Sequence, residues 1–419
     1  MRLLRVQLQA GMLPTVLFVS TIITLLCSAL VGIVYYRNLL LSRDRIQEEL
    51  IRNIHSGIQI LQGSNSFPLN TPVQFDLFQK GNDSVELTRK PWGVYTLASV
   101  KAFRGRHQEQ QAALLASLPD STTKAALYLT DEKRPLTLTG DTRLKGICYL
   151  PEAGIRTSYI DGKGFSGDMP KAAMQRKSTG QLPDLSEEYQ ERFALYTTIA
   201  ASPQALPIQQ LHTPALHSFL EAPRVYTSPE NIELSGRLQG NIILHTSQTL
   251  VLSSTAQLEN VLIVARRVII RSGFKGQVQV LAQDTVEIEN NVQLTYPSAV
   301  CVSNTKGCYM RIDEKSVIEG LVIVNNPTKN LSTLEAFKDR LDIEPKCLIM
   351  GYVYCDGLTE FKGILYGTLV SRRLFLRTPS ALYENYLMDV EIDVDKRPKV
   401  FLTSPLLSKA PTRILMWLD

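Results

Sequence analysis

One uncharged apolar stretch near the start of the chain, Leu13 to Tyr36, constrains the fold more than any other feature. As an α-helix rising ~1.5 Å per residue it would be about 36 Å long, enough to cross the hydrocarbon core of a membrane. No second stretch of this kind follows. We therefore expect a single transmembrane helix over residues 13–36, with the rest of the chain on one side of the membrane.

A helical pattern continues beyond this stretch, over residues 37–62. Apolar residues recur there at every third or fourth position and form one face: Ile46, Leu50, Ile54, Ile58 and Leu61. Between Arg37 and Gly57 there is no proline or glycine, and Pro68 follows the last apolar residue of the pattern. The pattern predicts an amphipathic helix that prolongs the transmembrane helix into one rod.

The flanks of the apolar stretch bear on its orientation. Residues 1–12 form a basic leader or cytoplasmic tail, with Arg2 and Arg5 and no acidic residue. Arg37, Arg43 and Arg45 lie just beyond the stretch, so the count of positive charges does not decide the orientation. Because the N-terminal tail is short, we expect a single-pass membrane protein whose large domain is periplasmic or extracytoplasmic.

From about Asn231 onward, short apolar runs alternate with glycine, asparagine and serine, which is typical of short strands. Runs that begin at Leu250, Val268 and Val286 follow one another at intervals of 18 residues. A second pattern, apolar–polar–Gly or Asn, begins at Leu238, Leu258, Phe274, Ile318 and Phe361. A fixed period of this length predicts a parallel β-solenoid over residues 224–395, whereas a β-sandwich would show hairpins with tight turns.

The longest internal match pairs Val264–Ser272 with Val370–Thr378, 106 residues later and close to six turns of the coil. The match places two sets of arginines at equivalent positions: Arg266, Arg267, Arg271, Arg372, Arg373 and Arg377. If these side chains line one edge, they are a candidate contact for lipid phosphate, an anionic glycan or an acidic partner surface. The alternative is a charged corner row that keeps the coil soluble.

Residues 72–223 form a less regular block, for which we predict a mixed α/β structure and a connection. Strands are predicted at Val73–Phe78, Val85–Thr88 and Trp92–Val100, and an amphipathic helix at Arg106–Leu118. An early turn of the coil begins near residue 136. We expect residues 180–223 to be a long connection, Leu331–Lys338 a short helix inserted in the coil, and residues 396–419 a C-terminal tail.

The sequence contains few patterns that carry chemistry. The net charge of +5 is spread along the chain without a basic block, so we expect no nucleic-acid partner. The chain has no G-x-S-x-G, no phosphate-binding loop and no CxxC pair. His212 and His217 flank a proline with no acid between them, which makes a poor metal site. We expect no catalytic residue, no metal and no cofactor.

Five cysteines lie outside the apolar stretch, an odd number that argues against a full disulfide framework. Cys301 with Cys308, and Cys347 with Cys355, would close short loops in an oxidising compartment. The alternative is that these residues, with Cys148, are small buried hydrophobes.

Acidic residues on the coil leave an enzymatic alternative open. Several polysaccharide-cleaving enzymes are β-helices that carry clustered carboxylates on an outer strand face. The candidates are Asp284, Glu287, Glu289, Asp313 and Glu314. They are scattered among positions that are expected to face solvent.

Two resemblances add to this interpretation. The basic leader ending in Gly11, the apolar stretch and the amphipathic continuation resemble the N-terminus of type IV pilins and type II secretion pseudopilins. That resemblance implies cleavage by a prepilin peptidase between Gly11 and Met12. Val16 stands where the family usually has a glutamate, which some tip-forming minor pseudopilins also lack, and Pro14 is not typical. The short apolar repeats of the C-terminal half are similar to those of the polymer-forming bactofilin β-helix.

Together these patterns predict a mainly β, membrane-anchored structural or assembly component of a bacterial envelope machine or filament, with a pseudopilin-like character. The expected partners are membrane lipid and other envelope proteins, reached through the helix and the coil surface within a multiprotein complex. Two alternatives remain open: a β-helix enzyme acting on polysaccharide, and a bactofilin-like polymerising cytoskeletal element.

Overall fold

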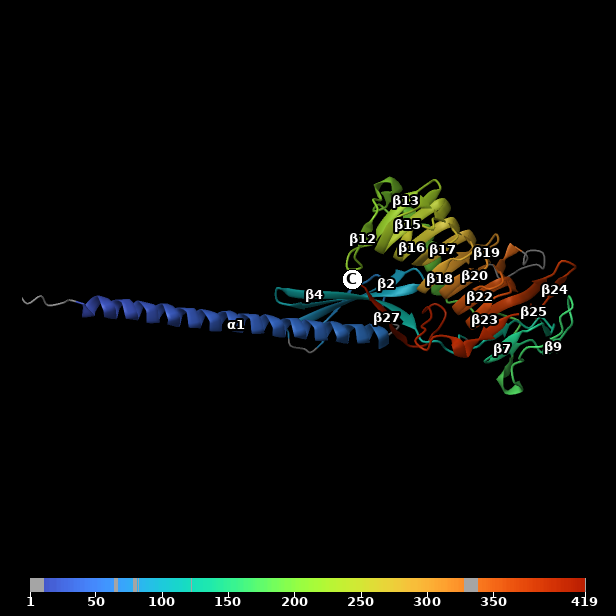
Figure 1. Cartoon of the computed structure of the whole chain (residues 1–419), viewed down its shortest axis with the longest axis horizontal. Coiled ribbons are helices and arrows are strands. Elements are labelled where there is room, and N and C mark those ends of the chain that lie inside the picture. Colours follow the sequence, from blue (N-terminus) through green and yellow to red (C-terminus); the bar gives the residue numbers. More distant parts are fainter. Residues whose placement is uncertain are drawn as a thin grey trace, which may run out of the picture. The chain divides into compact units, whose positions relative to one another are not determined.

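The computed structural model describes residues 11–63, 67–77, 81, 83–121, 123–327 and 338–418. It shows a mainly β chain with one long N-terminal helix and a parallel β-solenoid (Figure 1), which confirms the predicted fold class. The chain divides into two units. The first contains the helix as far as Gly57 with Val73–Glu86 and Val100–Gln110, and the second contains Ile58–Pro72, Leu87–Ser99 and all residues from Gln111.

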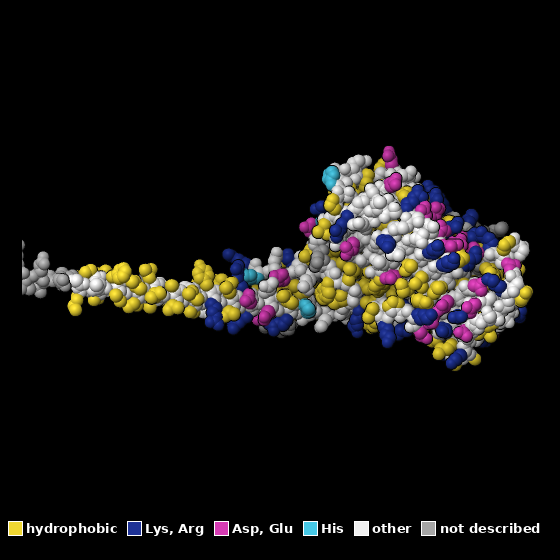
Figure 2. Space-filling model, viewed as in Figure 1, with side chains coloured by type: hydrophobic (Ala, Val, Ile, Leu, Met, Phe, Trp, Pro, Cys, Tyr) yellow, Lys and Arg dark blue, Asp and Glu magenta, His cyan; other side chains and the backbone are white. Residues whose placement is uncertain are grey.

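Helix α1, Met12–Gly63, is a single uninterrupted helix of 52 residues, as the sequence predicted. Its N-terminal half exposes large apolar side chains, with Leu17 61% and Leu25 70% accessible (Figure 2). Several hydroxyl groups in this half donate to carbonyl groups about one turn earlier, as Ser20 does to Leu17 and Thr24 to Ser20. The amphipathic half differs, because its apolar face, beginning at Leu50, is buried.

A five-stranded sheet follows the helix, in the order β1–β2–β3–β4–β27. Its strands are β1 (Val73–Phe75), β2 (Asp83–Trp92), β3 (Tyr95–Arg104), β4 (His107–Ser117) and β27 (Thr412–Leu418). Three of them match the predicted strands, but the predicted helix at Arg106–Leu118 is wrong, because these residues form β4. Residues Ala112 to Ser117 are buried without alternation, and a strand covered on both faces has the same continuous apolar run as a short helix.

The prediction for residues 396–419 is also wrong. Residues 396–419 were predicted as a tail, yet β27 pairs antiparallel with β4, with Thr412 opposite Ser117. The segment before it is also packed, since Phe401 and Leu406 are 5% and 3% accessible. Sequence alone did not disclose this, because a strand of seven residues acquires its partner only through tertiary contact.

The solenoid is built from long strands that stack in parallel, one rung on the next (Figure 1). In chain order they are β15 (Arg237–Leu252), β16 (Gln257–Ile270), β17 (Lys275–Ile288), β18 (Gln293–Ser303), β19 (Tyr309–Ile312), β20 (Val317–Asn325), β21 (Arg340–Ile343), β22 (Leu348–Phe361) and β23 (Ile364–Arg377). The pairing puts Leu250 opposite Val268, and Val268 opposite Val286. The 18-residue interval in the sequence is therefore one rung of the coil.

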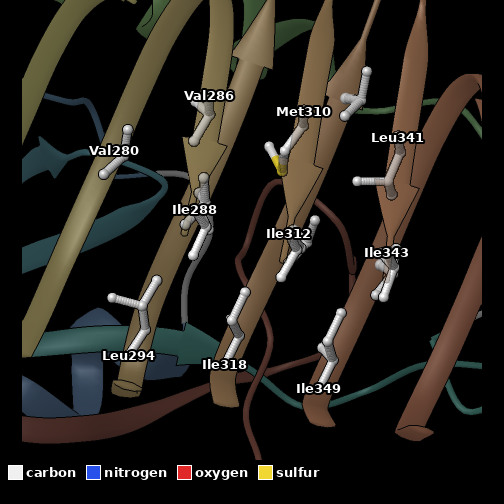
Figure 3. Packing of buried hydrophobic residues seen from close by; sticks show 14 of the residues in the cluster. Val280, Val286, Ile288, Leu294, Met310, Ile312, Ile318, Leu341, Ile343 and Ile349 are labelled. Atoms are coloured by element: carbon white, nitrogen blue, oxygen red, sulfur yellow. The ribbon is translucent and has the colours of Figure 1, made fainter. Parts of the chain in front are cut away.

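Stacking places like side chains above one another and builds the core. One inward column runs through successive rungs as Leu238, Leu258, Gly276, Leu294, Ile318, Ile349, Leu365, Ile392 and Leu144. Figure 3 shows Leu294, Ile318 and Ile349 in such a row, parallel to the rows of Ile288 and Val286. Where the column has Gly276, the Phe274 ring fills the space, with its Cζ 2.9 Å from the position a Cβ would take. Each fully buried leucine or isoleucine contributes about 1.5–3 kcal/mol.

The coil is longer than predicted and is not continuous in sequence. Before β15 comes a rung formed by β12 (Ala215–His217), β13 (Arg224–Ser228) and β14 (Ile232–Leu234), and β11 (Leu206–Pro207) pairs with β13 one rung further out. After β23 and β26 (Glu391–Asp393), the next rungs come from earlier in the chain: β5 (Leu127–Leu129), β7 (Arg143–Lys145), β8 (Cys148–Leu150) and β10 (Gln175–Lys177). Leu369 pairs with Leu127, for example. The predicted limits of 224–395 thus omit both ends, because much of the block at 72–223 belongs to the coil.

A small sheet and a hairpin complete this end of the coil. The three-stranded sheet has the order β25 (Tyr386–Met388), β6 (Leu136–Thr139) and β9 (Ile155–Thr157). Strand β24 (Leu382–Glu384) pairs antiparallel with β23. An early turn of the coil is predicted near residue 136, and the strand that begins at Leu136, β6, belongs to this small sheet.

One flank of the coil carries a second apolar core. Helix α2, Glu187–Thr197, lies within the predicted connection at 180–223 and buries Tyr189, Phe193 and Tyr196. These residues belong to a cluster with Leu262 and Ile323 of the coil and with Trp92. Arg192 of α2 also donates to the Tyr95 carbonyl and to Thr96 Oγ1, so the helix is held by polar contacts as well.

The internal repeats are only partly those that the sequence suggested. Ala265 and Ser371, the equivalent residues of the long match, are separated by five pairing steps rather than six, through Ala282, Val302, Val324 and Cys355. Loops such as Asn304–Gly307 lengthen individual turns. Of the second pattern, Leu238, Leu258 and Ile318 share a column, but Phe274 and Phe361 do not. The predicted helix at 331–338 lies, as far as Phe337, outside the described residues.

A column of small residues lets the rungs approach closely at one corner. Ser298, Gly320, Gly351 and Gly367 pair in succession, with φ of 141° to 158° at the three glycines. A Cβ on Gly351 would lie 1.9 Å from the Gly320 carbonyl oxygen of the rung below. No side chain fits there without separating the two rungs.

Replacing this glycine is expected to weaken the coil. Gly351→Ala should lower the free energy of unfolding by about 3 kcal/mol, because the methyl group collides with backbone. Denaturant unfolding of the full chain in detergent, followed by circular dichroism, measures the change. Gly180→Ala is the control, since its Cβ would make only an ordinary 3.6 Å contact. An equal effect of both substitutions would contradict the close-packed corner.

Candidate functional site

The six arginines singled out in the sequence do occupy equivalent places in the coil. Arg267 and Arg373 stand in one column, joined through Thr285, Tyr309, Arg340 and Leu358. Arg266 follows Ala265 and Arg372 follows Ser371, and Ala265 and Ser371 stand in one column of the coil. The register of the strands therefore aligns the two arginine sets along one edge.

Each of these arginines is paired with a carboxylate, usually on a neighbouring rung. Arg266 lies 2.5 Å from Asp284, Arg271 lies 2.6 Å from Glu289, and Arg373 lies 2.5 Å from Glu132. The other pairs are Arg267 with Glu287, Arg372 with Asp356, and Arg377 with Glu360. An anionic partner would have to compete with these internal acids, so an anion-binding role for the arginines stays a prediction that this geometry does not favour.

The pairs form part of a longer ladder of charge along the coil. Arg311 lies 2.6 Å from Asp313, and Arg340 lies 2.5 Å from Asp342. Figure 2 shows the result as basic and acidic side chains that alternate over the coil surface. The charges of adjacent rungs neutralise one another, which stabilises the stack by small increments, since exposed pairs contribute about 0–1 kcal/mol each.

The same pairs bear on the enzymatic alternative. Burial alone would raise the pKa of Glu289, but hydrogen bonds from the Ser272 amide and from Arg271 hold that pKa below its ordinary value. Asp284, Glu287 and Asp313 are also bound to arginines. A general acid for glycoside cleavage needs a raised pKa beside a second free carboxylate. Glu289 has a lowered pKa, and Asp284, Glu287 and Asp313 are engaged by arginines, an arrangement that does not favour this chemistry.

The five cysteines of the coil are buried single thiols, whereas Cys27 of α1 is exposed. Cys301 lies in the outer apolar cluster and Cys308 in the inner core, so the two are in different layers. Cys347 and Cys355 also form no disulfide, and they donate to different carbonyl groups, those of Asp313 and Leu358. Burial raises the pKa of Cys301, Cys347 and Cys355 to about 12. A thiol protonated at neutral pH is a poor nucleophile and a poor metal ligand.

Two further groups of candidates stay separate. His217 is buried and its Nε2 lies 2.7 Å from the Ala222 carbonyl oxygen, whereas His212 is exposed. In the part of the chain that the structure describes, no cluster of three or more His, Cys, Asp or Glu residues could hold a metal ion. Gly11 directly precedes α1, and cleavage between Gly11 and Met12 stays a prediction.

Sequence reasoning did not predict a hollow in the second unit. One of about 590 Å³ lies between the start of α2, Tyr352 of β22 and the segment Pro405–Lys409. Its walls come from three parts of the chain that are far apart in sequence and share no motif. No pattern in the sequence could have brought them together.

No protein-family model, curated protein or solved structure matches this chain. Its function therefore has to be argued from its own geometry.

The ion pairs of the coil differ in burial, so removing a buried carboxylate should destabilise the protein more than removing an exposed one. Glu360 is 4% accessible and holds Lys362 at 2.7 Å and the Arg377 amide at 3.1 Å. Glu360→Gln should lower the free energy of unfolding by about 2 to 3 kcal/mol, because cations are left without their buried carboxylate. Glu287→Gln, at the more exposed pair with Arg267, should cost less than about 1 kcal/mol. Denaturant titration of both variants measures the difference, and equal costs would contradict the assigned burial.

The thiols make a second prediction. In the native chain, N-ethylmaleimide should modify none of the five cysteines of the coil within minutes at pH 7.5, because burial keeps them protonated and covered. After unfolding in guanidinium chloride all five should react. Mass spectrometry counts the adducts. Fast modification of Cys301 or Cys355 in the native state would show that the coil is less closed than described.

Proposed function

We propose that this protein is a membrane-anchored structural or assembly component, in which α1 holds a stiff coil at a membrane. One observation carries the proposal: among the residues that the structure describes, α1 alone is long and apolar enough to cross a bilayer, and none of its most apolar segment is buried by the rest of the chain. An exposed apolar surface of this extent is unfavourable in water. A lipid environment removes that cost.

Details of the helix support a membrane span. Thr21 and Thr24 donate their hydroxyl groups to carbonyl groups about one turn earlier, and the interior backbone of an α-helix satisfies its own hydrogen bonds. Tyr35 and Tyr36 end the apolar segment and Arg37 follows them. Aromatic and basic residues at this position suit the interface between lipid and water.

A structural role for the coil is supported by its construction. Its core is a continuous set of apolar columns, and its outer charges are paired with one another. Such a body resists deformation and offers long, regular surfaces to partners. The candidate carboxylates and thiols are engaged in structural contacts, which favours a scaffold over a catalyst.

We extend the proposal to the cellular setting. The coil is extracytoplasmic, the helix contacts membrane lipid and helices of other envelope proteins, and the protein belongs to a multiprotein envelope machine or filament of a pseudopilin-like kind. The support is the basic residues Arg2 and Arg5 before the apolar segment, the uninterrupted helix α1 and the resemblance at Gly11 and Met12.

Membrane attachment is testable by fractionation. The full chain should stay in the membrane pellet after alkaline carbonate extraction. The double substitution Leu25→Arg and Leu26→Arg should release it, because each arginine at the middle of a span costs about 2.5–3.5 kcal/mol. Leu195→Arg with Leu382→Arg is the control, since these leucines are 47% and 50% exposed outside the span. Extraction of the unaltered chain by carbonate would overturn the proposal.

The pseudopilin-like assignment is tested by a separate measurement. Mass spectrometry of the chain isolated from membranes should find Met12 as the first residue if a prepilin peptidase acts on it. An intact leader would reject the pseudopilin-like assignment and leave the anchor proposal standing.

A further inference from the structure

The chain contains one asparagine–proline bond, between Asn326 and Pro327. None of its other prolines follows an asparagine. Asn326 comes directly after β20, and the chain returns to the coil at β21, which begins at Arg340. Asn326 is buried, with 3% of its surface accessible, and Pro327 is half-buried. The bond therefore lies where the chain leaves the coil for one of its longer connections.

A proline in this position changes the chemistry open to the asparagine. The common side reaction of asparagine is attack by the backbone nitrogen of the next residue on the side-chain carbonyl, which leads to loss of ammonia. Proline has no backbone N–H, so that route is closed at Asn326. The opposite attack stays possible, in which the side-chain nitrogen adds to the main-chain carbonyl of the same residue. This second reaction breaks the chain.

A buried carboxylate contacts the nitrogen that would attack. Asn326 Nδ2 donates a hydrogen bond of 2.8 Å to Asp339 Oδ2, while Asp339 Oδ1 accepts one of 2.9 Å from the Cys308 amide. Asp339 is 0% accessible. Burial raises the pKa of Asp339, although the two hydrogen bonds oppose that effect, so its carboxylate is a stronger base than one in water. A base within hydrogen-bond reach of the proton it removes is the arrangement that general base catalysis requires.

We propose that the chain cleaves itself between Asn326 and Pro327, with Asn326 Nδ2 as the nucleophile and Asp339 as the general base. Asp339 takes a proton from Nδ2 while this nitrogen bonds to the main-chain carbonyl carbon of Asn326. The bond from that carbon to the Pro327 nitrogen breaks, and the proton passes from Asp339 to the departing nitrogen. Pro327 becomes a free amino terminus, and Asn326 becomes a cyclic imide. Water then opens the imide to asparagine or isoasparagine, and no other reactant is needed.

The coil holds the two pieces together after cleavage. Strand β20 belongs to the first piece and pairs with β22 of the second, with Val324 opposite Cys355. Strand β4 of the first piece likewise pairs with β27 of the second. Asn326 and Pro327 also line a hollow of about 230 Å³, which gives water a way to the imide. We therefore expect the cleaved protein to stay folded and to separate only when it is denatured.

Mass spectrometry of the denatured protein tests the proposal. The full chain is purified in detergent with protease inhibitors and kept at pH 7.5 for several days. A fragment that begins at Pro327 should accumulate, together with one that ends at Asn326. Part of the second fragment should be lighter by one water molecule, which identifies the imide. A contaminating protease would leave an ordinary carboxyl terminus and no imide.

Two substitutions separate the assigned roles. Asn326→Ala removes the nucleophile and should abolish cleavage. Asp339→Asn keeps the shape of the base but not its function and should slow cleavage about a hundredfold or more, the usual contribution of a general base. Asn241→Ala is the matched control, because Asn241 is 2% accessible and its Nδ2 donates to the Glu221 carbonyl, away from this bond. It should cleave at the rate of the unaltered chain.

Circular dichroism confirms that each variant is folded. The proposal is overturned if the unaltered chain stays intact, if Asn326→Ala is still cleaved at this bond, or if Asp339→Asn cleaves at the unaltered rate. An intact chain would show that the contact between Asn326 and Asp339 only closes the connection. None of these outcomes affects the membrane anchor, which has its own test.

Discussion

Parallel pairing between rungs is the constraint on which the rest of this structure depends. Neighbouring strands in such a stack lie about 4.8 Å apart, so each residue has the equivalent residue of the next rung directly above it. Inside the coil this aligns leucine, isoleucine and valine into columns. At one corner it demands glycine, since the Gly320 carbonyl leaves no room for a Cβ at Gly351. Outside, like charges would repel, and the pairing of Arg266 with Asp284 and of Arg271 with Glu289 avoids this.

The coil is closed by a segment from elsewhere in the chain. Strands β5 and β7 continue the stack beyond β23 and β26, although they precede these strands in sequence. The open edge of the last sequential rung is thereby satisfied by the chain itself rather than left for another molecule. The connection back to the first rung includes α2, which covers a flank of the coil and brings Ser186 beside Tyr352.

The anchor and the coil meet different physical demands. In the proposed function the first half of α1 lies in lipid, where its exposed apolar side chains have an apolar surrounding. The coil is stable in water because its apolar columns face inward and its outer charges are paired. A scaffold held at a membrane needs both properties in one chain, and this is why the proposed function rests on their combination and not on any single residue.

Local periodicity alone determined much of this structure. The apolar run and the amphipathic pattern after it have the spacing of an α-helix, so the helix was predictable. The 18-residue interval repeats along the chain, so the coil was predictable as well. The helix predicted at Arg106–Leu118 was wrong because a fully covered strand and a short helix have the same apolar run. The arginines were located correctly, but their acidic partners were not, since Glu132 and Arg373 meet only after the chain closes on itself. Tertiary structure alone decided the ends of the coil, the place of β27 and the hollow at Tyr352, because each depends on contacts between residues that share no spacing in the sequence.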